Sequence, residues 1–502
     1  MYKRIFSIMI LCIFVFANSG FAQLSLKRNE NDFDPSVDIE VTVEVNTIRW
    51  LEEPLASTDL LINNVNTFDL LVEEIRSTFQ TPSQSPAIPA EKSFYLIISI
   101  NDVEFESPIW RQNNHIYHPA WNVTLDVPDD EEFVDIIIQL WNHQDDDADV
   151  LCDLSPQSDA YEAYLSYSIA TGHWTGDDFR EDTSGYGRLN GCDDGSIYQS
   201  DFDSELWFTI TQNDADDDKI PHWYEVNMLG TNPEEDDGDL DLDGDICSTY
   251  WEYRWGYDPL IAEDHDAIDA DGDSISNYEE FLTAKWYSDP FRKDVFVEQD
   301  IMDDGPNGQS CHFPPRAGEL IQTAFDRQNI VFHLDNGTMG GRDIIPFKEN
   351  VDYDELDQYY VDYFLHNDSS NWRRGVFHYG VVVYSSVSAA GFMYRPNAFQ
   401  ISAAGHDNIV NNNPTFIEDV VYGSAYIHEL GHTFGFFPIP GHNRLSGVLG
   451  IIDFIRTLPY RSCMNYGFMY ELVDYSDGSR IPPDKDDWDP SRMRFDFFEQ
   501  DW

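Results

Sequence analysis

The chain has few basic residues. Its 502 residues include 29 lysines and arginines against 93 aspartates and glutamates, a formal net charge of −64. Nucleic acid and anionic membranes are negatively charged themselves and would be repelled, so we expect neither as a partner. The acidity does not indicate disorder, because aromatic residues make up 15% and hydrophobic residues 42% of the chain, which is enough for packed cores.

Cysteine is also scarce. None of the six cysteines belongs to a Cys-x-x-Cys pair, which argues against a structural zinc knuckle. Cys12 falls in the N-terminal leader described next, which leaves an odd number for the rest of the chain. Cys152–Cys192 is the first candidate disulfide and Cys311–Cys463 the second, and the spacing leaves the pairing open.

Long apolar runs are missing except at the N-terminus. Residues 1–22 are typical of a signal peptide, because Lys3 and Arg4 are basic, residues 5–16 are apolar and small residues precede the cleavage position. This run is too short for a comfortable membrane span, and no other stretch reaches the necessary length. We therefore expect a secreted, extracellular monomer without membrane insertion, whose mature chain begins near Gln23.

Residues 23–210 favour a β-sandwich. Apolar residues alternate strictly from Val37 to Val45, as in a strand with one buried face. Further strands, separated by polar turns, are expected at 94–100, 122–127, 133–141 and 206–210. The string YHPAWN at 117–122 and the acidic loop at 145–149 resemble a C2-type domain. That loop could bind calcium or be a solvated turn.

Three acidic loops follow within residues 211–290, starting 27 and 28 residues apart. Each has carboxylates at positions 1, 3, 5 and 12, the spacing that wraps oxygen ligands around one calcium ion. The candidate calcium ligands are Asp214, Asp216, Asp218 and Glu225 in the first loop, Asp241, Asp243, Asp245 and Glu252 in the second, and Asp269, Asp271, Asp273 and Glu280 in the third.

These loops differ from an EF-hand in the position of glycine. Gly244 and Gly272 lie at position 4, and position 6 has no glycine in any of the three. The segment resembles thrombospondin type-3 or dockerin-like calcium repeats, and this resemblance implies structural Ca²⁺ that stiffens a linker. A plain acidic linker is the alternative interpretation.

The sequence HELGH at residues 428–432 predicts a catalytic metal site. In a helix, His428 and His432 lie on the same face and can bind one zinc ion. Glu429 then lies beside the first ligand, close enough to polarise a zinc-bound water. Gly435 can end such a helix with a left-handed cap.

A short turn, SCMNY at residues 462–466, follows the helix. The combination of HExxHxxG with a Met-x-Tyr turn resembles the metzincin clan of zinc endopeptidases, over residues 291–502. The resemblance implies a mixed α/β (α+β) catalytic domain in which Met464 is structural and supports the floor of the metal site. It also implies that Tyr466 is an extra zinc ligand or oxyanion partner, whereas the alternative is a core tyrosine under the site.

The third metal ligand departs from the usual pattern. The position of the usual third histidine is occupied by Pro438, whose side chain cannot bind zinc. The next histidine, His442, follows what looks like a four-residue insertion of the kind found in some secreted prokaryotic relatives, and we expect it to be the third ligand. The alternatives are Asp453, His406 and His378, and His442 would then be a solvated loop histidine.

The remaining elements of this region fit the same architecture. Strands are expected at 294–298, 330–334 and 380–384, with a helix at 316–325. The segment 399–402 is expected to be the edge strand that pairs with an extended peptide substrate.

Together these features predict a secreted zinc endopeptidase stabilised by calcium, with a protein or peptide as substrate. A zinc-activated water would attack the scissile carbonyl, and Glu429 would act as general base and then general acid. The main alternative is a calcium-dependent surface adhesion or binding protein with a degenerate metal site, which Pro438 favours. A zinc hydrolase acting on a non-peptide bond is a third possibility.

Overall fold

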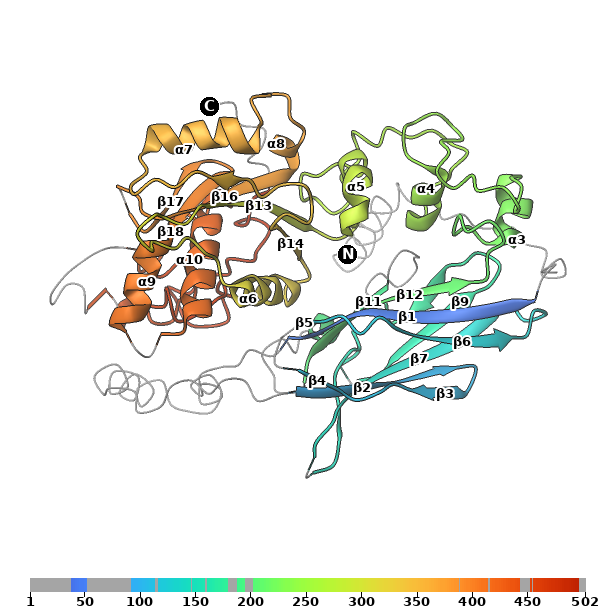
Figure 1. Cartoon of the computed structure of the whole chain (residues 1–502). Helices are drawn as coiled ribbons and strands as arrows, with labels where there is room; N and C mark the ends of the chain where they lie inside the picture. The colour runs from blue at the N-terminus through green and yellow to red at the C-terminus, as the bar shows by residue number, and fades with distance from the viewer. Residues whose placement is uncertain are drawn as a thin grey trace, which may run out of the picture.

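The computed structural model describes residues 38–51, 92–112, 116–145, 147–158, 160–178, 187–194, 202–387, 389–413, 416–442, 452–453 and 455–495 (Figure 1). The predicted signal peptide lies outside the described residues. Within these ranges, no helix has both the length and the apolar character needed to cross a membrane.

The first domain is a β-sandwich of two antiparallel sheets (Figure 1). The first sheet has the order β11-β12-β1-β5, and β6 also pairs with β1. The second has the order β10-β9-β7-β2-β3, with β4 on β2 and β8 on β7. The bounds in the first sheet are β1 (Ile39–Trp50), β5 (Ile116–Tyr117), β6 (Trp121–Val127), β11 (Gly187–Asn190) and β12 (Ser204–Gln212). Those in the second are β2 (Lys92–Ile100), β3 (Val103–Glu106), β4 (Trp110–Gln112), β7 (Phe133–Asn142), β8 (Val150–Leu151), β9 (Ala163–Ser168) and β10 (Trp174–Gly176).

The core of the sandwich follows from the alternation in its strands. Val41, Val43 and Val45 of β1 are fully buried and pack with inward-facing residues of the second sheet such as Ile98 and Ile138. The predicted β-sandwich is therefore confirmed. The sequence did not reveal β8 or β10, because two or three residues carry too little alternation to be distinguished from a loop.

The acidic segment is a series of loops and short helices between the sandwich and the third sheet (Figure 1). Each position-12 glutamate lies on one of these helices. The bounds are η2 (Gly191–Asp194) within the sandwich, then α3 (His222–Tyr224), η3 (Glu225–Leu229), α4 (Thr249–Trp255), α5 (Asn277–Thr283) and η4 (Ala284–Trp286). Ser248 and Ser276 cap α4 and α5, since each side chain accepts a hydrogen bond from a first-turn N–H.

The third sheet has the order β14-β13-β16-β18-β17, with β15 on β13. All its pairs are parallel except β17 with β18. Its strands are β13 (Asp294–Met302), β14 (Val331–Asp335), β15 (Ile344–Ile345), β16 (Phe377–Val383), β17 (Gly391–Arg395) and β18 (Ala398–Ser402). The helices of this part are α6 (Pro315–Asp326), α7 (Tyr353–Tyr359), η5 (Tyr360–Phe364), α8 (Arg373–Val376), α9 (Ala403–Asn412) and α10 (Glu418–Thr433).

Helices cover both faces of this sheet (Figure 1). Val295 and Val297 of β13 pack in the core that includes α6 and α10, whereas Phe296 between them packs in the core that includes α7 and η5. Both faces are buried, and the parallel strands are rich in apolar residues, although four of the nine residues of β13 are polar or charged. This layered arrangement places α10 beneath β17 and β18.

The prediction that residues 399–402 form the edge strand was wrong. The segment 399–402 lies inside the sheet as part of β18, and the edge strand is β17, which runs antiparallel to it. Every residue of β18 is buried, whereas every residue of β17 is only half-buried, as expected for a strand with one unpaired side. The apolar run in β18 indicated a strand correctly, but a fully buried strand belongs in the interior of a sheet.

Neither expected disulfide is formed in the described chain. Cys311 and Cys463 lie in the two cores on opposite faces of the third sheet, which separates them. Cys152 belongs to the sandwich core, and the Cys192 thiol donates to Asp203 Oδ2 at 3.5 Å.

A buried ionic cluster joins the sandwich to the third-sheet domain. Arg49 and Glu205 are 3.0 Å apart, and Arg49 also contacts Asp326 at the end of α6. Arg188 pairs with Glu205, while Arg292 lies 3.7 Å from both acids. All five side chains are at least 90% buried. This cluster therefore fixes the two domains against each other, because separating them would leave buried charges unpaired.

We expect Glu205→Gln to lower the unfolding free energy by about 3–5 kcal/mol at neutral pH, because it leaves buried arginines without their partner. Burial alone would raise the pKa of Glu205, but the surrounding arginines lower it to about 2. Its contribution is therefore present above the unfolded pKa of about 4.3 and is lost as the pH falls toward 2. Urea unfolding of both proteins at pH 7 and pH 3 would test this, and an equal difference at the two pH values would contradict it.

Candidate metal centres

Helix α10 carries the HELGH motif along a buried face. Val421 and Ala425 are fully buried, and His428 and Glu429 are 2% and 4% exposed. The helix ends at Thr433, two residues before Gly435, as the sequence predicts. The motif therefore lies in the last turns of the helix, where the chain turns back toward the site.

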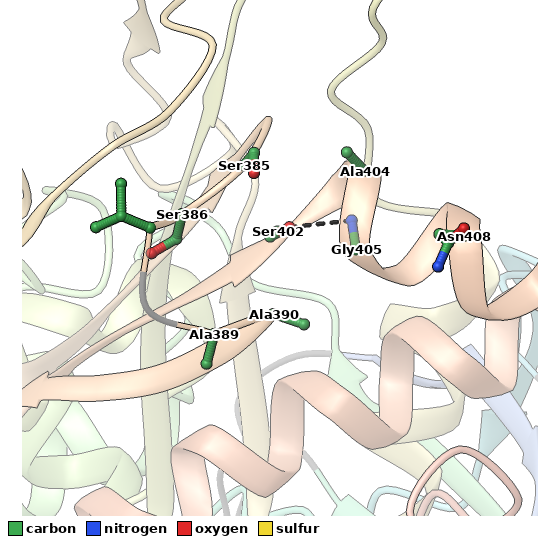
Figure 2. A pocket seen from close by; sticks show the side chains of 9 residues that line it. Ser385, Ser386, Ala389, Ala390, Ser402, Ala404, Gly405 and Asn408 are labelled. Atoms are coloured by element: carbon green, nitrogen blue, oxygen red, sulfur yellow. Dashed lines mark hydrogen bonds between the residues drawn. The ribbon is translucent and has the colours of Figure 1, made fainter.

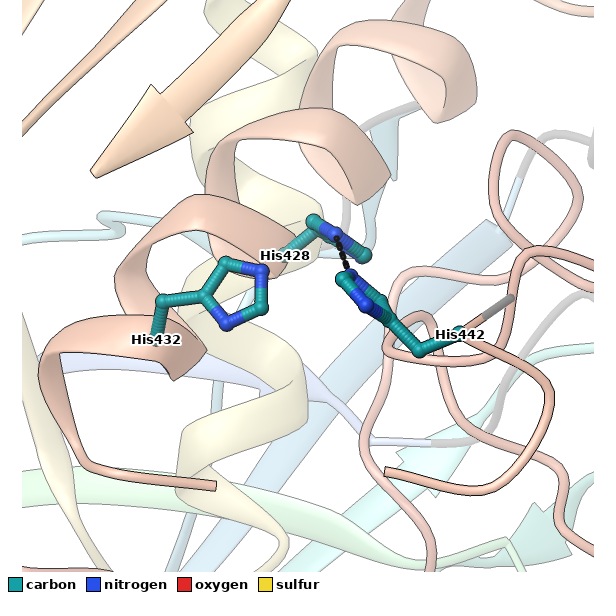
Figure 3. Close-up of side chains that lie close together, drawn as sticks. All are labelled: His428, His432 and His442. Atoms are coloured by element: carbon teal, nitrogen blue, oxygen red, sulfur yellow. Dashed lines mark hydrogen bonds between the residues drawn. The ribbon is translucent and has the colours of Figure 1, made fainter. Parts of the chain in front are cut away.

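Three histidines converge at the end of this helix (Figure 3). One nitrogen from each of His428, His432 and His442 lies within 4.8 Å of the other two. The Nε2 atoms of His428 and His442 are 3.2 Å apart. Nitrogens about 2.0–2.1 Å from one zinc ion in a tetrahedral arrangement have a similar spacing. The structure thus brings together the three residues expected as zinc ligands.

Two of the alternative ligands have other partners. His378 on β16 is buried, and its Nδ1 lies 3.1 Å from the Thr433 hydroxyl. His406 on α9 is also buried, and its Nδ1 donates to the Ser402 carbonyl oxygen at 2.7 Å. Both side chains therefore support the packing between sheet and helices.

The turn at 462–466 orients the first histidine. The Cys463 carbonyl oxygen lies 2.8 Å from His428 Nδ1 and accepts its proton, which leaves Nε2 with a lone pair for a metal. Burial, with His442 nearby, lowers the pKa of His432 to about 4. That imidazole is therefore neutral at pH 7, as a metal ligand must be.

Met464 and Tyr466 occupy different places at this turn. Met464 is fully buried, and its Sδ would lie 2.5 Å from a Cβ built on Gly431, so the glycine of HELGH lets the turn pack against the helix. The ring of Tyr466 stacks on His442 with centroids 4.2 Å apart, and its centroid is 5.6 Å from that of His428. Tyr466 is only half-buried, so it lies beside the three histidines and is not a core tyrosine under them.

The edge strand passes directly over the glutamate of the motif. A Cβ built on Gly391, the first residue of β17, would lie 2.5 Å from Glu429 Oε1. The start of β17 is therefore next to the carboxylate. The sequence could not show this contact, because the two residues are far apart along the chain.

A pocket of about 490 Å³ adjoins the start of β17 (Figure 2). Its lining consists mainly of small side chains and hydroxyls: Ser385, Ser386, Val387, Ala389, Ala390, Ser402, Ala404, Gly405 and Asn408. The Ser402 hydroxyl accepts a hydrogen bond from the Gly405 N–H at 3.0 Å and begins α9 beside the pocket. Small or polar groups fit this lining best.

The first acidic loop gathers its carboxylates, as expected. Oxygens of Asp214, Asp216 and Asp218 lie within 4.8 Å of one another. Asp218 and Glu225 form a second such group with Asp237, a residue that the loop spacing does not include. Glu225 is fully buried, and its Oε2 has no hydrogen-bond partner. The set fits a cation with oxygen ligands.

The third loop joins the start of β13. The Asp294 N–H donates to Asp273 Oδ2 at 2.7 Å, and Lys293 Nζ donates to the Asp271 carbonyl oxygen at 2.6 Å. Burial first, and neighbouring acids second, raise the pKa of Asp271 to about 8 and that of Glu280 well above its ordinary value. Glu280 Oε1 is buried without a hydrogen-bond partner. These buried carboxylates fit a cation with oxygen ligands.

The second loop has a different neighbour. Asp241 accepts backbone N–H groups of its own loop, from Gly244 at 2.6 Å and Ile246 at 2.9 Å. The imidazole of His265, from the following segment, lies 3.2 Å from Asp245. Sequence spacing treats the three loops as equivalent, but the structure distinguishes this one.

The acidic loop of the sandwich is held by its own neighbours. Arg111 pairs with Asp145 at 2.7 Å, and His143 and Tyr95 contact Asp149 at 3.0 and 3.1 Å. Asp146 lies outside the described residues. These contacts favour the solvated turn over a calcium site.

No protein-family model matches the chain, and no curated protein matches its sequence. Human GIVD cytosolic phospholipase A2 is 10% identical over 36% of this chain, with a TM-score of 0.19, and the chain spans only 18% of that protein's length. A solved C2 domain is 7% identical over 34% of this chain and 97% of its own, with a TM-score of 0.18. A C2 domain of plant extended synaptotagmin 1 is 7% identical over 36% of this chain and 96% of its own, with a TM-score of 0.19. No functional argument follows from similarities this low.

We predict that Gly431→Val lowers the unfolding free energy by about 1–3 kcal/mol, because the new side chain would overlap Met464 and force the turn away from the helix. Thermal unfolding measures the loss. Glu418→Val, on the exposed first turn of the same helix, is the control for introducing a β-branched residue. Equal melting temperatures for the two variants would show that the turn does not depend on this close approach.

Proposed function

We propose that the protein is a zinc-dependent endopeptidase of the metzincin type. The convergence of His428, His432 and His442 next to Glu429 carries this proposal. Three imidazoles suit zinc, and catalytic zinc sites have three protein ligands with one position left for water or substrate. The orientation of His428 and the neutral state of His432 support the same metal.

The mechanism assigns a separate task to each residue around this centre. When bound, zinc would polarise the scissile carbonyl and lower the pKa of the attacking water to about 7. Glu429 accepts the proton of that water and then donates it to the leaving amine. Tyr466 donates a hydrogen bond to the carbonyl oxygen as negative charge develops there. The Cys463 carbonyl oxygen keeps His428 in the tautomer that presents Nε2.

The edge strand supports a peptide as the substrate. An extended peptide can add to the unpaired side of β17 through main-chain hydrogen bonds. Gly391 then brings the peptide backbone close to Glu429, because no side chain separates the strand from the carboxylate. We assign the pocket at the start of β17 to a small or polar side chain of the substrate.

The decisive test compares the wild type with Glu429→Gln and His442→Ala in the presence of calcium. We expect the wild type to cleave casein, and Glu429→Gln to keep its zinc but lose about 10²–10⁴-fold in rate, because it lacks the proton acceptor. His442→Ala should lose zinc. Rates and zinc content are measured on the same samples.

The other outcomes separate the alternatives. Undiminished cleavage by Glu429→Gln would refute the proposed mechanism. A wild type that binds no zinc and cleaves nothing would favour the calcium-dependent adhesion or binding protein. Pro438 favours that alternative, because it stands where the third histidine is usually found. His442 supplies an imidazole near His428 and His432 instead.

We also propose Ca²⁺ as a structural cofactor, bound by the first and third loops. Buried carboxylates without enough positive partners support this assignment. At the third loop, calcium would stabilise the start of β13, because Lys293 and Asp294 contact that loop directly. A need for bound calcium fits the expected secretion of the protein as an extracellular monomer. A C2-like topology for the sandwich remains a proposal, without a calcium role for its acidic loop.

Glu280→Gln tests the third loop. A calcium ion present at 100 times its dissociation constant stabilises the folded protein by about 2.7 kcal/mol, and this stabilisation is lost when the site no longer binds it. We therefore expect the calcium-dependent rise in melting temperature to shrink in Glu280→Gln. Glu234→Gln, an exposed acid of the same segment, should behave like the wild type. An unchanged rise in Glu280→Gln would mean that calcium does not bind there.

A further inference from the structure

An imidazole nitrogen lies among the carboxylates of the second acidic loop. His265 is 2% exposed, and its Nε2 lies 3.2 Å from Asp245 Oδ2 and 3.8 Å from Glu252 Oε1. At the first loop the additional group is the Asp237 carboxylate, and at the third loop it is the backbone N–H of Asp294 in β13. The second loop therefore offers a cation a different set of donor atoms.

These groups lie within ion-pair distance of one another, but their alignment is poor for hydrogen bonds. His265 Nε2 and both carboxylate oxygens of Glu252 are buried and have no hydrogen-bond partner. Glu252 is fully buried, so water does not replace the missing partners. Leaving such groups unsatisfied is costly, and ligands of a common metal ion show this combination of short distances and poor mutual alignment.

A thiol completes the group. Ligand atoms of Asp245, Cys247 and His265 lie within 4.8 Å of one another, and Cys247 is fully buried. Calcium takes six to eight oxygen ligands, whereas zinc takes about four from imidazole, thiolate and carboxylate. The mixture of nitrogen, sulfur and oxygen therefore favours a transition metal over calcium.

Asn277 can hold the imidazole in the orientation that a metal needs. Its Nδ2 lies 3.2 Å from His265 Nδ1, while its Oδ1 is buried and has no partner. Exchanging the two amide atoms, which have nearly the same shape, lets Oδ1 accept the proton of Nδ1. Nε2 then keeps a lone pair directed toward Asp245 and Glu252.

We propose that the second loop is a structural transition-metal site, with zinc as its ion, bound by Asp245, Glu252, His265 and Cys247. Binding releases the thiol proton of Cys247 to solvent, because the thiolate is the ligand. The competing arrangement is a metal-free ion pair between protonated His265 and the two acids. This pair would leave at least one oxygen of Glu252 without a donor.

The test counts zinc in the full-length protein after dialysis against zinc in millimolar calcium, which fills the oxygen sites. We expect two zinc ions per chain in the wild type, one in His265→Gln and one in His432→Ala. Glu263→Gln, an exposed acid beside the same loop, is the matched control and should keep two. Thermal unfolding of each variant in calcium shows that it is folded.

The two variants separate this inference from the proposed peptidase site. If the wild type holds one zinc ion that only His432→Ala removes, the second-loop site is refuted and the catalytic site stands. If the wild type holds one zinc ion that only His265→Gln removes, the catalytic zinc site is refuted and the second-loop site stands. Cobalt provides a second readout, because a Co²⁺–thiolate bond gives a near-ultraviolet charge-transfer band. We expect this band in the wild type and its loss in Cys247→Ser, and a wild type without the band would remove Cys247 from the ligand set.

Discussion

The neutralisation of buried carboxylates is the constraint on which this structure depends. With a formal net charge of −64, the chain has few basic side chains with which to neutralise the acids that it buries. At the junction of the two domains the cations are arginines, which surround Glu205 and Asp326. In the acidic segment the described side chains supply fewer cations, and bound metal ions are the source that we propose. On this proposal, the same sequence property accounts both for how the domains are joined and for what the segment between them binds.

The proposed catalytic centre avoids this problem by using neutral ligands. Packing rather than charge brings the three histidines together: His428 and His432 lie on a helix whose back is buried against the third sheet, and His442 lies in the loop that follows it. The floor of the site is the turn at Met464, which fits against Gly431. The centre therefore depends on close packing, whereas the loops, as we propose, depend on bound ions. The two kinds of site should fail for different reasons when the protein is perturbed.

The sequence predicted what local patterns can encode. Alternating valines gave β1, the i, i+4 spacing gave the shared face of His428 and His432 on α10, and the spacing of acids gave the three loops. Contacts between distant segments were not predictable. Asp237 and His265 lie outside the twelve-residue spacing, so only the folded chain shows that they meet Asp218 and Asp245. The edge strand was misplaced for a similar reason, since the sequence shows that a segment is extended but not which neighbours it will have.

The loop between α10 and His442 shows how a metal site can tolerate a change in chain length. Closing a longer loop costs only about 0.6 kcal/mol for each doubling of its length. Here the loop is also attached along its course, because Lys485 Nζ donates to the Pro438 carbonyl oxygen at 2.7 Å and Gly441 packs against Asn465. A histidine that follows a longer loop can therefore occupy the same position as one that follows a shorter loop. In the proposed peptidase, a change in the length of this loop would alter the surroundings of the three histidines without moving them, so substrate preference could diverge independently of catalysis.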